Sequence, residues 1–120
     1  AEINARRGED DRLIYCVDSV HGFGNQVMSI PAFNADFVMS GCHKWLFGPR
    51  GTGIVAGSEA GWKMVDPVIP TFLDSDAYGR WKRNDLAPET DGAIFSPGGF
   101  KAFEHLWALN EAFALHALFG

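Results

Sequence analysis

The sequence lacks any apolar stretch that approaches the roughly 20 residues needed to cross a bilayer. It also lacks a run of Lys or Arg that would form a basic stripe, and its formal net charge is −5. The first eight residues are polar and charged, which is unlike a signal peptide. These absences argue against a membrane protein and against nucleic acid as a partner.

Cysteine is scarce: the 120 residues contain only Cys16 and Cys42, and their spacing is not that of a metal site. Each lies in or beside an apolar segment, which favours buried, reduced thiols over a disulfide. Reduced thiols are typical of cytoplasmic proteins, so we expect that location. Glu104 and His105 have no second histidine at zinc-binding spacing, so no metal is expected.

Both ends of the sequence suggest that it belongs to a longer chain. There is no initiator Met, and residues 2–7 are similar to the tail of a helix that stops at Gly8. At the other end, residues 112–119 are still strongly apolar. We therefore expect residues 1–120 to form the central part of a larger domain.

Short, continuous apolar runs predict buried strands at residues 12–17 and 36–39. The connection between them is too long for a hairpin and has room for a short helix around residues 26–30, so the two strands are expected to be parallel. A third strand is predicted at residues 52–56, and Ser58 is expected to cap a brief helix that runs to residue 64. This order predicts an α/β fold.

The second half of the chain is less regular. Residues 65–93 contain three prolines and many charges, so we expect an irregular surface segment that is functional or contacts another subunit. A helix is predicted over residues 100–118. One face of this helix is expected to pack in the core, and it is formed by Phe103, Leu106, Trp107, Asn110, Phe113 and Ala114.

Two opposite charges follow the first two predicted strands. Asp18 comes directly after one strand and Lys44 soon after the next, so both are expected at the carboxyl edge of the sheet, where α/β proteins bind ligands. A salt bridge at the sheet rim is one interpretation. The neighbouring His21 and His43 and the Gly-rich turn that follows Lys44 favour a ligand site instead. A lysine in a dry, aromatic-walled site has a lowered pKa, which makes it an amine nucleophile for an aldehyde cofactor.

These segments resemble a known family. Residues 18–24 (Asp-Ser-Val-His-Gly-Phe-Gly) and 40–53 (Ser-Gly-Cys-His-Lys-Trp-Leu-Phe-Gly-Pro-Arg-Gly-Thr-Gly) are similar to the class V aminotransferase group of fold-type I enzymes, which use pyridoxal 5′-phosphate (PLP). The similarity is greatest to the isopenicillin N epimerase-like branch, which includes ergothioneine-type C–S lyases. Residues 96–100 and 103–105 also fit this branch. The resemblance covers nearly the whole chain from Leu13 onward.

The resemblance implies a three-layer α/β/α large domain with a mostly parallel sheet. Residues 1–120 would be its central part, without the N-terminal part and the C-terminal small domain. It further implies a small amino-acid substrate and a homodimer with active sites at the subunit interface. Ser96 is a candidate to reach the cofactor of the partner subunit.

The resemblance also implies a role for each site residue. Lys44 would form a Schiff base with PLP and then move the α-proton of the substrate. Asp18 would pair with the pyridinium nitrogen and keep the ring an electron sink. His21 would lie near the 3′-oxygen of the ring, while His43 would lie beside the phosphate or orient the lysine. Ser40 is a weaker candidate for the phosphate.

Several of these positions have simpler interpretations. Relatives such as cysteine desulfurases place a serine three residues before the lysine, where this sequence has Gly41, and this puts the assignment of Ser40 in doubt. His21 and His43 are also compatible with purely structural roles. Arg50 is either an exposed charge or a partner for the substrate carboxylate. Residues 48–53 lack the Gly-Lys-Ser/Thr ending of a phosphate-binding P-loop, so nucleotide binding is not expected.

The resemblance favours an epimerase-like or C–S lyase-like enzyme that works through an α-carbanion. Aminotransferase or cysteine desulfurase-like activity is an alternative, because the same carbanion leads to each outcome. A second hypothesis of a different class is a non-catalytic fragment that acts as a binding or structural module.

Overall fold

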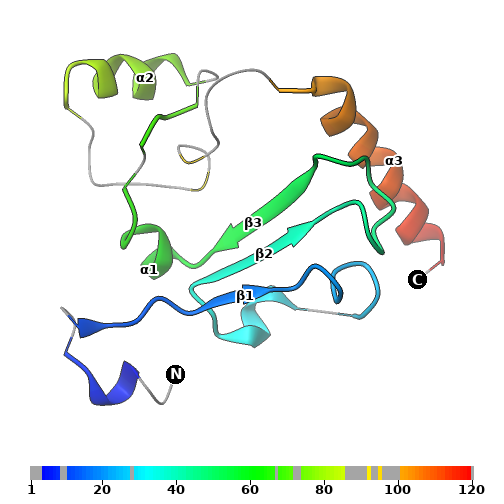
Figure 1. The fold of residues 1–120 in the computed structure, drawn as a ribbon, viewed down its shortest axis with the longest axis horizontal. Helices are drawn as coiled ribbons and strands as arrows, with labels where there is room; N and C mark the ends of the chain where they lie inside the picture. The colour runs from blue at the N-terminus through cyan, green and yellow to red at the C-terminus, as the bar shows by residue number, and fades with distance from the viewer. Residues whose placement is uncertain are drawn as a thin grey trace.

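The structure is a computed structural model that describes residues 4–8, 11–27, 29–66, 68–71, 74–85, 92, 95 and 101–119. A small sheet contains strands β1 (Cys16–Asp18), β2 (Phe37–Gly41) and β3 (Gly53–Gly57) in that order. The described helices are η1 (Asn4–Arg6) and η3 (Ile30–Phe33), which are 3-10 helices, and α1 (Glu59–Trp62), α2 (Ser75–Lys82) and α3 (Phe103–Phe119). Figure 1 shows the small sheet with α1 and α3 beside it and α2 set apart from the strands.

The sheet is mixed. Strands β1 and β2 are parallel, as the sequence predicts, and the register places Asp18 opposite Met39. Strands β2 and β3 are antiparallel, with Gly41 opposite Gly53, so the expectation of a mostly parallel sheet does not hold for this pair. The reason is the connection, residues 42–52, which contains no helix in the structure. Parallel neighbours need a longer crossover, usually a helix.

Strand β1 is an edge strand in this structure, and it is shorter than predicted. Leu13, Ile14 and Tyr15 precede it and are 48%, 42% and 48% exposed. Cys16 is also exposed, so the expectation of a fully buried strand and a buried thiol at this position is wrong. A continuous apolar run predicts a strand that is buried on both faces. In this structure, the other described residues pack over only part of the run, so its side chains stay exposed.

A buried carboxylate fixes the start of the sheet. Asp36, which is 4% exposed, accepts hydrogen bonds from the Tyr15 amide at 2.8 Å and from the guanidinium of Arg12. The backbone carbonyl of Asp36 accepts from the Ser58 amide at 2.8 Å, directly before α1. One residue therefore joins the segment before β1, the start of β2 and the cap of α1.

The helices agree with the sequence in part. Ser58 caps α1 as predicted, because its hydroxyl accepts from the Gly61 amide. The predicted helix around residues 26–30 lies later, as η3. Helix α2 lies within the segment predicted to be irregular, and it begins where the side chain of Asp74 accepts a hydrogen bond from the Ala77 amide. None of the helices in the described ranges is long and apolar enough to cross a membrane.

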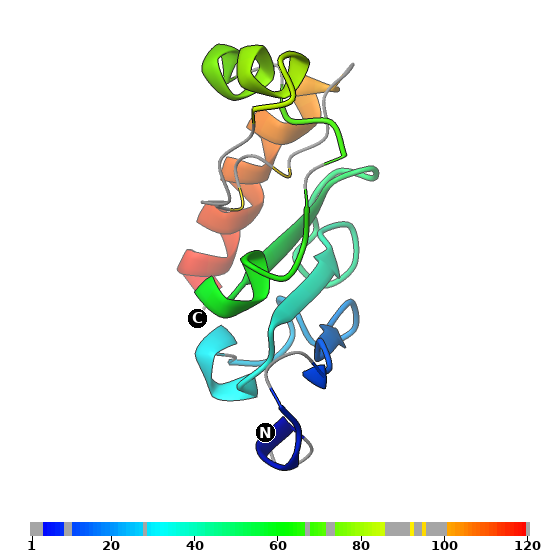
Figure 2. The ribbon, with the colours of Figure 1, turned by 90° about the vertical axis from the view of Figure 1, so that its left-hand side faces the viewer.

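Helix α3 packs with a different face from the one expected. Figure 2 shows α1 and α3 on the same side of the sheet. On α3, Ala112 is buried and Leu109 packs beside it, whereas the predicted core residues Phe103, Trp107 and Phe113 are 41%, 70% and 46% exposed. Apolar residues surround α3 on nearly all sides, so helical periodicity alone does not select the buried face.

Because Asp36 is buried and paired, we expect Asp36→Ala to lower the free energy of unfolding by about 2 kcal/mol. The substitution removes the charged hydrogen bond with Arg12 and leaves the Tyr15 amide without its acceptor. Urea unfolding of the purified protein measures this change. The matched control is Asp11→Ala, which removes an exposed ion pair with Arg7 and should change stability by about 0.5 kcal/mol or less. Equal effects of the two substitutions would contradict the anchoring role of Asp36.

Candidate functional site

Asp18 ends β1 and opens a tight turn. Its carboxylate oxygen Oδ1 accepts a hydrogen bond from the Val20 amide at 3.0 Å, and its side chain is exposed. The carbonyl of Ser19 accepts from the Gly22 and Phe23 amides at 2.9 and 2.8 Å, which folds the chain back over the end of the strand. The Oδ1 atom of Asp18 therefore holds the turn. The second carboxylate oxygen of Asp18 accepts no hydrogen bond from the residues that the structure describes.

Ser19 has a buried polar group that sequence analysis did not single out. Its amide donates to the Met39 carbonyl at 2.8 Å and so continues the β1–β2 ladder past Asp18. Its hydroxyl Oγ is buried and has no hydrogen-bond partner among the described residues. Unpaired buried hydroxyls are costly and uncommon in folded proteins, so the Ser19 hydroxyl is an unusual feature of this edge of the sheet.

Residues 42–48, called the lysine loop below, follow β2 and carry Lys44. The Gly48 amide donates to the Cys42 carbonyl at 2.8 Å, and the Cys42 amide donates to Thr52 at 3.0 Å, so hydrogen bonds close the loop at its base. Cys42 and Leu46 are 0% and 3% exposed and form a core cluster with Ala112 of α3. The residues between them point outward, and Lys44 is exposed. Two buried anchors thus present the lysine at the sheet edge.

The turn after β1 and the lysine loop are in direct contact through Gly24. Gly24 has φ of +81°, and a Cβ at this position would lie 2.6 Å from the Leu46 amide nitrogen. Glycine is therefore required at this position both by its backbone conformation and by the close approach of a second backbone. The two segments that the sequence associates with one site lie side by side in the structure.

The structure brings the remaining predicted site residues to the same edge in different ways. His21 lies exposed in the turn after Asp18. His43 is exposed, and its ring lies over Gly41, where a Cβ would be 3.1 Å from the Nδ1 and Cε1 atoms. Ser40 is 7% exposed and its hydroxyl donates to the Gly41 carbonyl at 3.0 Å. The side chains of the two histidines and of Lys44 have no hydrogen-bond or ion-pair partner in the described part of the chain.

Helix α3 contacts the lysine loop, which sequence analysis did not predict. His116 shares a 2.8 Å hydrogen bond with the Trp45 carbonyl through Nε2, and its ring stacks on Phe47 with centroids 5.9 Å apart. Leu109 contacts Gly48, where a Cβ would lie 2.7 Å from Cδ2. These contacts join residues about 60 to 70 positions apart, so no local sequence pattern reveals them.

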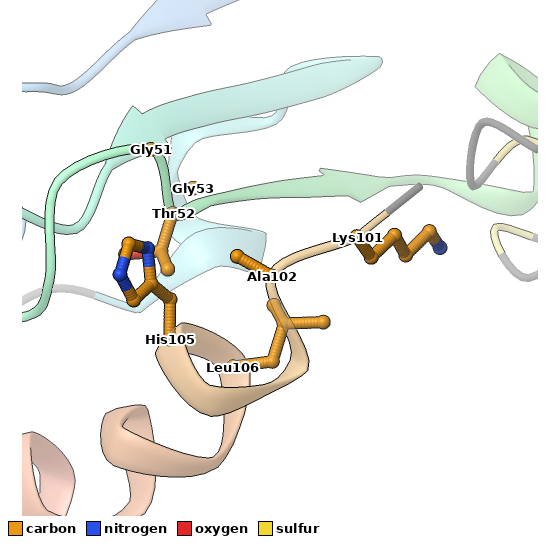
Figure 3. A pocket seen from close by; sticks show the side chains of 7 residues that line it. All are labelled: Gly51, Thr52, Gly53, Lys101, Ala102, His105 and Leu106. Carbon is orange, nitrogen blue, oxygen red and sulfur yellow. The ribbon is translucent and has the colours of Figure 1, made fainter. Parts of the chain in front are cut away.

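Other candidate positions lie elsewhere. A pocket of about 340 Å³ separates the start of β3 from the first turn of α3 (Figure 3), and none of the predicted site residues lines it. Its walls are residues 51–53, Lys101, Ala102, His105 and Leu106.

Arg50 is exposed in the turn before this pocket. Ser96 lies outside the described residues. Within the described ranges, no cluster of His, Cys, Asp and Glu residues could hold a metal ion.

Burial raises the pKa of the Cys42 thiol, and its hydrogen bond with Thr52 opposes that rise in pKa. A raised pKa leaves less thiolate near neutral pH, so we expect iodoacetamide to modify the exposed Cys16 well before Cys42. Mass spectrometry of partly alkylated protein measures the order, and urea-unfolded protein is the control in which both react alike. Faster modification of Cys42 in the folded protein would contradict its burial.

The contact at Gly24 predicts a measurable difference between two glycines with similar backbone angles. Gly24→Ala and Gly51→Ala both place a side chain at positive φ, +81° and +83°, which costs about 1–2 kcal/mol. Only Gly24 has another backbone in the way, because nothing lies within 4 Å of a Cβ at Gly51. We expect Gly24→Ala to destabilise the protein more in urea unfolding; equal losses would show that the two loops do not touch.

One family model and several curated relatives are similar to this chain. The family described as Aminotransferase class-V matches residues 2–71, which include Asp18, the lysine loop and β3. Two L-cysteine desulfhydrase-like proteins of Epichloe uncinata, lolT1 and lolT2, are 31% and 30% identical over 88 and 96 residues. These matches cover 68% and 80% of this chain, and 19% and 20% of the relatives.

An aminotransferase of Methanocaldococcus jannaschii, described as uncharacterized, is 28% identical over 76 residues, which are 61% of this chain and 20% of that protein. The chain thus spans about a fifth of the length of the curated relatives that it matches. The family match covers more than half of the chain and includes residues 18–24 and 40–53. The chain therefore belongs to the class V aminotransferase family, whose enzymes depend on PLP.

Proposed function

We propose that this chain supplies the cofactor-binding lysine of a PLP-dependent enzyme that acts on an amino acid, and that Lys44 is that lysine. The observation that carries the proposal is the arrangement at the sheet edge. Asp18 ends one of two parallel neighbouring strands and the lysine loop follows the other, and the turn after Asp18 touches the lysine loop at Gly24. An amine and a carboxylate are thereby held on adjoining segments at the edge where α/β sheets bind ligands.

The side chains present fit the chemistry of PLP. The cofactor has an aldehyde that binds an amine and a ring nitrogen that binds an acid, and its ring accepts electrons from the substrate α-carbon when bound. The Lys44 amine is exposed and has no partner within the described ranges. One carboxylate oxygen of Asp18 likewise accepts no hydrogen bond from the described residues. The lysine amine is thus available for the aldehyde and the carboxylate for the ring nitrogen.

Each residue has a proposed task in the reaction. Lys44 binds the cofactor and afterwards accepts and returns the α-proton of the substrate. Asp18 would hold a proton on the ring nitrogen, and His21 would donate a hydrogen bond to the 3′-oxygen. His43 contacts the phosphate or orients the lysine. Ser40 is a further phosphate ligand only if its hydroxyl leaves the Gly41 carbonyl.

The class of reaction is proposed from the relatives. Removal of the α-proton starts epimerisation, C–S cleavage and amino transfer alike. Two relatives carry L-cysteine desulfhydrase-like names. These names support C–S cleavage, in which a sulfur substituent leaves the β-carbon, more strongly than return of the proton to the opposite face. We therefore propose a C–S lyase-like enzyme, with epimerisation as the alternative.

We also propose that residues 1–120 are the central part of a three-layer α/β/α large domain, in a homodimeric cytoplasmic enzyme. The length of the relatives supports a larger protein, since the chain spans about a fifth of them. The exposed apolar side chains of α3 give further support: Trp107, Leu118 and Phe119 are 70%, 81% and 82% exposed. Side chains of this size are normally covered in a mature fold.

The test is to trap the cofactor on its lysine. We expect the purified protein, mixed with PLP and reduced with borohydride, to carry the phosphopyridoxyl group on the peptide that contains Lys44, because the nucleophile there is an exposed amine without a partner among the described residues. Lys44→Ala should abolish the modification. Mass spectrometry locates the modified residue.

The matched control is Lys63→Ala, which removes an exposed lysine that pairs with Glu59 on α1 and should leave the modification of Lys44 intact. Modification of equal extent in Lys44→Ala would refute the assignment. Assays of the full-length protein for β-elimination, racemisation and amino transfer then separate the reaction classes, and β-elimination of a sulfur substituent is the expected result.

A further inference from the structure

We propose that His116, on α3, is a positioning residue that holds the lysine loop in the conformation from which Lys44 reaches the cofactor. This inference rests on the proposed function of Lys44. His116 lies 72 residues after Lys44 in the sequence. It touches the loop on both sides of Leu46, at Trp45 and at Phe47.

The first contact is a hydrogen bond. His116 Nε2 lies 2.8 Å from the Trp45 carbonyl oxygen. A carbonyl only accepts hydrogen bonds, so Nε2 carries a proton and donates the hydrogen bond to the Trp45 carbonyl. The helix thus fixes the peptide group between Trp45 and Leu46, one residue beyond Lys44.

The second contact supports an unfavourable backbone conformation. Phe47 has φ of +59°, in the left-handed region that residues other than glycine rarely adopt. Burial does not hold Phe47 there, because 65% of it is exposed. Its ring instead stacks on the His116 ring at an interplanar angle of 20°. A strained residue three positions after a functional lysine needs such a contact to keep its conformation.

The two contacts act on Lys44 through a short path. The Phe47 amide donates to the Lys44 carbonyl at 3.2 Å, and the Gly48 amide closes the loop on Cys42 at 2.8 Å. When His116 fixes Trp45 and Phe47, it therefore also fixes the backbone at Lys44. The lysine stem has four flexible carbons, so its reach depends on where its backbone is held.

The rest of the helix face makes the contact rigid. Leu109, Ala112 and His116 follow at spacings of three and four residues, so they lie on one face of α3. Ala112 is buried against Cys42 and Leu46, and Leu109 contacts Gly48. This packing sets the distance between α3 and the lysine loop. His116 adds a hydrogen bond to the loop near the C-terminal end of the helix.

Two substitutions separate the ring from the donor. His116→Phe keeps an aromatic ring for Phe47 but removes the donor, whereas His116→Gln keeps a donor at the position of Nε2. In cofactor-free protein, we expect amide hydrogen exchange at Phe47 and Gly48 to be about tenfold faster in His116→Phe, the order expected for one lost hydrogen bond. Exchange should return toward the wild-type rate in His116→Gln.

The second readout is the rate at which PLP becomes fixed to Lys44 under borohydride. It should fall in His116→Phe and recover in His116→Gln. The matched control is His105→Phe, which changes another histidine of the same α3 face, at the pocket rather than at the lysine loop. Exchange of the amides that pair β2 with β3 should be unchanged in all three variants, which shows that the fold is intact.

The outcomes distinguish the two proposals. If the wild-type protein fixes no PLP on Lys44, the proposed function is wrong and the positioning role is overturned with it. If the wild type fixes PLP and His116→Phe matches it in exchange or in fixation rate, only the positioning role is overturned. Faster exchange with slower fixation, absent in His105→Phe and reversed in His116→Gln, supports it.

Discussion

The parallel pairing of β1 with β2 is the constraint on which the candidate site depends. It places Asp18 opposite Met39, so the carboxylate and the segment that leads to Lys44 leave the sheet at the same edge. The register is fixed at the far end by Asp36, whose buried carboxylate binds the Tyr15 amide and Arg12. A slip of one residue would turn the side chains of β1 to the opposite face and move Asp18 away from the lysine loop.

The lysine loop adds a second constraint, because its anchors come from distant parts of the chain. Cys42 and Leu46 are buried against α3, and Gly24 brings the turn after β1 into contact with the loop backbone. Lys44 is exposed between these buried anchors. The loop therefore combines a rigid base with a free amine, which is the combination that a lysine needs in order to bind an aldehyde in a defined direction.

The elements that depend on local chemistry could be predicted from the sequence, and those that depend on distant partners could not. The apolar runs predict the β1–β2 pair, and Ser58 predicts the cap of α1. The cap at Asp74 predicts α2 equally well, but the surrounding prolines favoured an irregular segment. The buried face of α3 and the contact of His116 with the loop depend on packing between segments about 70 residues apart, for which a helix that is apolar on all sides gives no signal.

The central claim is that one PLP molecule meets both Lys44 and Asp18 at the carboxyl edge of the sheet. A crystal structure of the full-length protein with PLP tests it most directly. We predict continuous electron density from Lys44 Nζ to the cofactor, with the ring nitrogen within hydrogen-bond distance of the Asp18 oxygen that does not hold the turn at Val20. Attachment to another lysine, or a ring nitrogen that faces a residue other than Asp18, would contradict this account.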